Sequence, residues 1–180
     1  MKTKRIFVIL TICLLSVLAI IGILKPHSVT AQSEAQTLFS KKCSIFVTGT
    51  YLTTISDANG QLASRGVITL TSDGNFFVID SNQGGVKGAF NPFGDTQGAY
   101  TCTGNQEISA TGINFGFSGP DGTNDIARSD IHATFSRLTQ AVKGTITVRS
   151  FALNANPLEE KGLVVGTFPF IGQRVKVNPA

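Results

Sequence analysis

The chain has 180 residues, with 15 Lys and Arg against 11 Asp and Glu, which gives a formal net charge of +4 at pH 7. Four of the basic residues and none of the acidic residues lie in the first 31 positions, so the rest of the chain has no net formal charge. That remainder has no basic cluster longer than Lys41-Lys42, which argues against a nucleic-acid partner.

Residues 1–31 have the pattern of a secretory signal peptide. Lys2, Lys4 and Arg5 form a positive start, residues 6–24 are mainly apolar, and small residues precede a cleavage site after Ala31. The apolar run is also close to the length of a membrane-spanning helix, so a retained N-terminal anchor is the alternative. We therefore expect a secreted or periplasmic protein, which would contact a membrane only if the leader is retained.

The organisation expected from the sequence is a signal peptide at 1–31, an extension at 32–43 and a β-barrel domain at 44–180. Short runs of β-branched and aromatic residues, separated by Gly, Asn and Asp, predict eight strands and almost no helix. In chain order the expected strands are 45–55, 66–71, 76–80, 98–103, 107–117, 126–135, 142–152 and 163–177, the last of them bent or broken at Pro169.

The connections between these strands are nearly all short hairpins. This pattern favours an all-β fold in which eight antiparallel strands close into an up-and-down barrel, because closure removes the exposed sheet edges. An open sandwich is the alternative. Strand 126–135 illustrates the alternation, since Ala127, Ile131 and Phe135 would face the core and Asp130 and His132 the other side.

Two cysteines, Cys43 and Cys102, lie beyond the leader. In an exported protein such a pair predicts a disulfide, which would stabilise the fold by roughly 4 kcal/mol in the chain-entropy model. Two buried free thiols are the alternative. Together with His132, the only histidine after residue 31, they do not make a zinc site, and no motif points to a metal or a cofactor.

Four short motifs carry a family resemblance: Thr48-Gly49-Thr50-Tyr51, Leu70-Thr71-Ser72-Asp73-Gly74, Gly98-Ala99-Tyr100-Thr101-Cys102-Thr103-Gly104 and Ile171-Gly172-Gln173-Arg174-Val175. The pattern resembles the lipocalin-like, or calycin-like, barrels of small exported bacterial proteins, which are mostly uncharacterised. The resemblance implies that Arg174 packs over the aromatic residue of the first strand, which is Tyr51 here and Trp in lipocalins. Both residues would then be structural.

The titratable residues of strand 126–135 form one candidate site, on the face that carries Arg128, Asp130, His132 and Thr134. If it lined the interior, His132 could be a general acid or base oriented by Asp130, in a cofactor-free isomerase or cyclase. The other interpretation is a solvated outer face. A turn at Thr139-Gln140 would then place Asp130 opposite Arg149 and His132 opposite Thr147.

The long connection 81–97 carries Phe90 and Phe93 between several glycines. Long loops are often functional, so these rings could cap a barrel mouth and contact a ligand, or they could simply anchor the loop. The sequence therefore predicts a non-enzymatic exported barrel that binds a small apolar molecule or has a structural role in the cell envelope. The barrel enzyme and a protein-interaction module that uses loop 81–97 are the alternatives, and the oligomeric state stays open.

Overall fold

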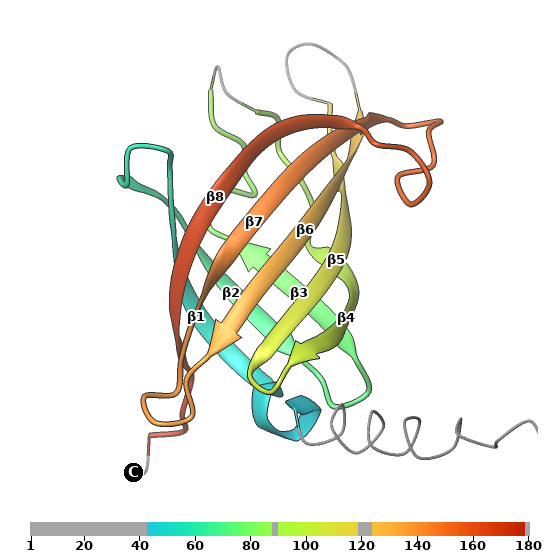
Figure 1. Cartoon of the computed structure of the whole chain (residues 1–180). Helices are drawn as coiled ribbons and strands as arrows, with labels where there is room; N and C mark the ends of the chain where they lie inside the picture. Colours follow the sequence, from blue (N-terminus) through green and yellow to red (C-terminus); the bar gives the residue numbers. More distant parts are fainter. Residues whose placement is uncertain (1–42, 88–89, 119–123, 179–180) are drawn as a thin grey trace, which may run out of the picture. The chain divides into compact units, whose positions relative to one another are not determined.

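The computed structural model describes residues 43–87, 90–118 and 124–178. Eight strands follow one another: β1 (Gly49–Ser56), β2 (Leu62–Leu70), β3 (Asn75–Asp80), β4 (Thr96–Gly104), β5 (Glu107–Gly116), β6 (Asp125–Phe135), β7 (Ala141–Ala152) and β8 (Leu163–Arg174). Each pairs antiparallel with its neighbours in sequence, and β1 pairs with β8, so the barrel is closed (Figure 1). The predicted up-and-down barrel is confirmed over an open sandwich, and it is consistent with a lipocalin-like fold.

The strands form because apolar residues recur at every second position, which gives each strand one face toward the interior. In β6, Ile131, Ala133 and Phe135 are buried, whereas His132 and Thr134 are exposed. The same period places the inward positions of the other strands, so the closed sheet encloses a single core.

The expected first strand, 45–55, is wrong at its start, because residues 43–47 form a short helix and β1 begins at Gly49. The Thr48 N–H and hydroxyl both donate to the Ser44 carbonyl, at 3.0 and 2.7 Å, and end this helix. Gly49 then adopts φ 148°, a conformation that favours glycine, and turns the chain into β1. A short apolar run such as Ile45-Phe46-Val47 does not distinguish helix from strand by its period.

The last strand is also shorter than 163–177, since β8 ends at Arg174, and it runs unbroken through Pro169. Pro169 instead limits the pairing with β1, whose last pair is Ile55 with Phe170. The Val175 N–H donates to the Thr50 carbonyl of β1, so alternate residues of β8 face β1 and position 169 is one of them. Proline has no N–H to donate there, and the ladder stops.

The register between β6 and β7 differs from the expected one by two residues. Asp130 lies opposite Thr147, and His132 opposite Thr145. The reason is the turn, which is centred near Leu138 rather than on Thr139-Gln140, because Phe135 pairs with Val142.

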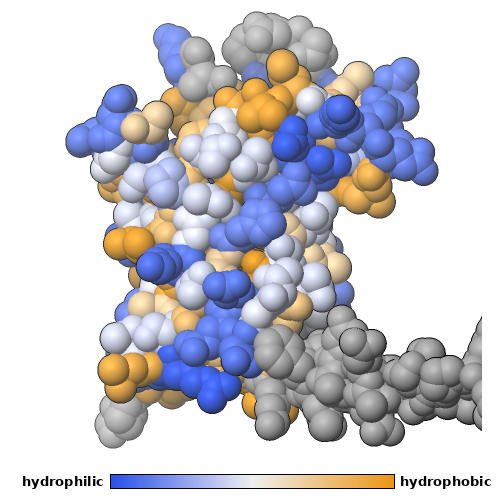
Figure 2. Space-filling model, in the orientation of Figure 1, coloured by the Kyte–Doolittle hydropathy of each residue, from blue (hydrophilic) through white to orange (hydrophobic). Residues whose placement is uncertain are grey.

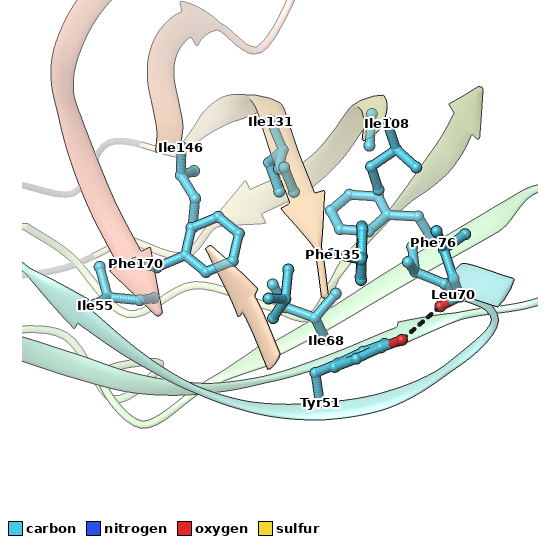
Figure 3. Close-up of a cluster of buried hydrophobic side chains, with 14 of the residues drawn as sticks. Tyr51, Ile55, Ile68, Leu70, Phe76, Ile108, Ile131, Phe135, Ile146 and Phe170 are labelled. Carbon is cyan, nitrogen blue, oxygen red and sulfur yellow. Dashed lines mark hydrogen bonds between the residues drawn. The ribbon is translucent and has the colours of Figure 1, made fainter. Parts of the chain in front are cut away.

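The two ends of the barrel differ. The helix end carries the helix 43–47 and the turns 71–74, 105–106 and 136–140, and the loop end carries the connections 57–61, 81–95 and 153–162 (Figure 1). Side chains from seven strands point toward one another in the core (Figure 3). There the rings of Tyr51 and Phe135 meet edge to face, with their centroids 5.2 Å apart.

Candidate functional site

The barrel interior is filled by side chains. A cavity of about 10 Å³ remains among apolar residues that include Ile68, Leu70, Phe76, Ile131 and Phe170. That is roughly the space of one water molecule, whereas small-molecule sites occupy about 300–1,000 Å³. The core as it stands therefore has no room for a small apolar ligand.

Toward the loop end the interior becomes polar. The Asn114 amide nitrogen donates to the Thr96 hydroxyl at 2.8 Å, and both residues are buried. Asn114 Oδ1 is buried without a hydrogen-bond partner among the described residues. Two further inward hydrogen-bonded pairs are Ser64–Asp80 and Ser150–Asp125. Within each pair the two side chains are hydrogen-bonded to each other, so Asn114 Oδ1 is the exception among these inward polar groups.

Tyr51 and Arg174 close the helix end. The Tyr51 hydroxyl donates to the Val47 carbonyl at 2.9 Å, which ties β1 to the helix. The Arg174 guanidinium lies 5.6 Å from the centroid of the Tyr51 ring, the contact that the family resemblance implies. Burial raises the pKa of Tyr51, and the nearby Arg174 charge opposes part of that rise. These contacts join β1, β8 and the helix 43–47 at this end of the barrel.

Cys43 and Cys102 form a disulfide in the structure, with an S–S distance of 2.03 Å. The bond joins the helix 43–47 to β4 across the helix end. Cys43 and Val47 are fully buried, so the helix is packed against the barrel as well as tethered to it.

His132 and Asp130 both lie on the outer face of β6. His132 is exposed, and its Nδ1 is 2.8 Å from the Ser109 hydroxyl on the neighbouring strand β5. A Ser–His pair can activate a nucleophile, but that chemistry also needs an orienting group on the other ring nitrogen and a pocket beside the pair. No hydrogen bond to Nε2 occurs among the described residues, and both His132 and Asp130 lie outside the barrel rather than in an interior pocket.

Asp130 links two arginines instead. Its Oδ2 is 3.2 Å from both Arg128 and Arg149, although Arg149 is a diagonal rather than a direct neighbour. Arg128 donates to the carbonyls of Pro157 and Glu160, and it lies 5.4 Å from the centroid of the Phe151 ring. The cluster fastens connection 153–162 to the barrel wall.

The connection 81–95 is built onto the end of β5. Phe93 forms an isolated bridge with Gly116, and the Phe117 N–H donates to the Pro92 carbonyl at 2.7 Å. Phe93 is half-buried and its ring centroid lies 5.8 Å from that of Phe90. Phe93 thus anchors the loop, whereas Phe90 is 45% exposed.

The loop end carries four exposed apolar side chains, which we call the phenylalanine surface: Val86 (37% exposed), Phe90, Phe115 (56%) and Phe117 (54%). The Phe117 ring also covers Gly94, where a Cβ would lie 3.6 Å from the ring. Clustered exposed apolar groups of this kind mark binding surfaces more often than scattered ones do.

Phe115 and Phe117 were not among the candidates that the sequence indicated. The signal was available, because Ile108, Ala110 and Asn114 face the interior and residues at odd positions of the same run must therefore face outward. Phe90 was a candidate, but its neighbours on the surface depend on the Phe93–Gly116 bridge, which joins segments with no local pattern in common.

Within the part of the chain that the structure describes, no helix is long and apolar enough to cross a membrane, and no three His, Cys, Asp or Glu side chains gather as metal ligands would. Comparisons with protein-family models, with curated proteins and with solved structures found no match to this chain.

Proposed function

We propose that the protein is an exported interaction module that binds a protein partner through the phenylalanine surface. The observation that carries the proposal is the contrast between a filled interior, with a cavity of about 10 Å³, and four exposed apolar side chains at the loop end. Export is supported by the leader pattern and by the Cys43–Cys102 disulfide, a bond typical of oxidising compartments.

The surface can supply useful binding energy without any catalytic chemistry. Covering on the order of 300 Å² of aromatic and aliphatic area, at about 25 cal/mol per Å², would contribute about 7 kcal/mol before the cost of association. Phenyl rings have few rotatable bonds, so ordering them costs little. Phe115 is further held by β5, which presents its ring from a rigid strand.

The charge around the surface favours a protein partner over a lipid bilayer. Among the described residues of connection 81–95, Lys87 is basic and Asp95 is acidic, so the charge here is mixed and is not the basic cluster that anionic headgroups attract. The surface also contains neither Trp nor Tyr, the residues enriched at membrane interfaces. A partner with an apolar groove fits this chemistry better.

The proposal can be tested by site-specific photo-crosslinking in the native host. A photoreactive phenylalanine analogue at position 117 should give one discrete protein adduct, whereas the same analogue at the exposed position Thr145 on β7 should not. Replacing Phe90 and Phe115 by Ala should abolish the adduct.

Equal adducts from both positions, or none from position 117, would count against the proposal. Two other measurements address the alternative occupants. If the protein sediments with phospholipid vesicles and this sedimentation depends on Phe90, the partner is a lipid surface rather than a protein. A lipid retained by the purified protein, and detected by mass spectrometry, would return the function to small-molecule binding.

A further inference from the structure

The outer wall of the barrel is divided into a charged half and an uncharged half. On β5, β6 and β7 the outward-facing side chains include Glu107, Arg128, Asp130, Lys143 and Arg149. Figure 2 shows a polar band descending diagonally over β6 and β7. On β8, β1, β2 and β3, all within the described residues, Arg65 is the one outward-facing charged side chain.

The uncharged half carries a continuous apolar row. Leu52 on β1 lies directly opposite Val67 on β2, which lies directly opposite Ile79 on β3. Phe77 and Ile171 extend the row to neighbouring positions on β3 and β8. We call these five residues the apolar wall. Four of them are exposed, from 38% for Phe77 to 67% for Ile171.

The border of the apolar wall is formed by threonines and by Arg65, which lies two residues along β2 from Val67. Thr50 and Thr69 are hydrogen-bonded across β1 and β2, with 3.2 Å between their hydroxyls, and Thr69 lies directly opposite Phe77 on β3. An apolar centre with a small polar border is the usual composition of a protein interface, and homodimer interfaces are the most apolar.

We infer that the apolar wall is the contact surface between two copies of this chain. A charged partner would find a single group to pair with, Arg65, which already donates to the Thr53 carbonyl at 3.3 Å. A lipid bilayer around the barrel would have to accept the charged half as well. A second apolar wall meets neither obstacle.

Two-fold symmetry suits the position of Arg65. In an isologous pair centred on the Leu52–Val67–Ile79 row, the two Arg65 side chains fall on opposite sides of the axis, because Arg65 lies two residues along β2 from Val67. The two walls would stack as sheets do in a sandwich, about 10 Å apart, with their side chains interdigitated. Since the chain beyond the leader has no net formal charge, long-range repulsion between copies is small.

Sedimentation equilibrium of the purified protein, over about 1–300 μM, tests this inference. The protein should dimerise reversibly, and Leu52→Glu should weaken the dimer at least 30-fold. Thr145→Glu places the same charge at an exposed outward position of β7 and should leave the dimer unchanged. Phe117→Ala should also leave it unchanged, which separates this inference from the proposed function.

A second measurement covers the case in which Leu52→Glu disturbs folding. A cysteine at Thr54, which lies on the outward face beside Ile171, should be crosslinked between copies by a short bismaleimide, and a cysteine at Thr145 should not. A protein that stays monomeric over the whole range would overturn the inference. So would a dimer that Phe117→Ala abolishes and Leu52→Glu does not.

Discussion

The guanidinium of Arg174, the last residue of β8, lies 5.6 Å from the ring centroid of Tyr51, an inward residue near the start of β1. The same guanidinium donates to the Gln140 side chain at 3.0 Å. One side chain therefore joins the two strands that close the barrel and the turn that precedes β7.

Replacing Arg174 by Ala should lower the free energy of unfolding by about 1–2 kcal/mol, because it removes a cation–π contact and a charge-assisted hydrogen bond. Urea unfolding measures the loss. Lys176→Ala is the matched control, since Lys176 is an exposed cation just beyond β8. If the two variants are equally stable, Arg174 does not close this end.

The protein should become less stable in alkali, because Tyr51 ionises there. Its folded-state pKa is raised above the ordinary 10.0, so the folded chain holds this proton more tightly than the unfolded chain does. The resulting stabilisation is complete below pH 10 and is lost as pH rises from there through the raised pKa. Absorbance at tyrosinate wavelengths should show an ionisation above pH 10 that Tyr51→Phe removes. A titration curve whose high-pH part is the same in wild type and Tyr51→Phe would contradict the assignment.

The Cys43–Cys102 disulfide closes a separation of 59 residues. Replacing both cysteines by Ser should cost about 4 kcal/mol in the chain-entropy model. The helix 43–47 should then become the first site of limited proteolysis, because its covalent link to β4 is gone. Wild-type protein with and without reductant provides the comparison, and an unchanged unfolding midpoint would show that packing of Val47 suffices.

Asn114 and Thr96 offer a test of buried polarity. Thr96→Val alone should lower the free energy of unfolding by about 1–2 kcal/mol. It would leave both the nitrogen and the oxygen of the Asn114 amide without a hydrogen bond. The double change Thr96→Val and Asn114→Leu should be neutral or stabilising. A double variant that loses more than about 2 kcal/mol would indicate that the Asn114 oxygen has a partner such as an internal water.

The barrel itself was predictable because alternation and turn chemistry repeat along the whole chain. In β6, the period of two that buries Ile131 and Phe135 is visible in the sequence, and the hairpin connections leave few other topologies. The order of the strands and their closure follow from that repetition.

Features were not predictable where two local structures fit the same stretch of sequence about equally well. The helix at 43–47 forms where an apolar run also fits a strand, and the disulfide and the burial of Val47 decide between them. The β6–β7 register depends on the centre of one turn, yet the expected ion pair of Asp130 with Arg149 still forms, because long side chains reach diagonally across a sheet.

Only part of the candidate site could be predicted from the sequence, for a similar reason. Phe90 stands out in a glycine-rich connection, but Phe115 belongs to a strand and would ordinarily be assigned to the core. Only the alternation of β5 places it outside, and only the bridge of Phe93 to Gly116 brings the loop beside it.

The place where Pro169 ends the β1–β8 ladder also bears on how the barrel forms. Five residue pairs, from Tyr51 with Arg174 to Ile55 with Phe170, make this seam, and they join parts of the chain that are about as far apart as the domain allows. Contacts between distant segments form late, since the chain must first lose the entropy of the long loop between them. Every other pair of neighbouring strands is consecutive in sequence and can pair as a local hairpin. Folding should therefore finish, and unfolding should begin, at the β1–β8 seam.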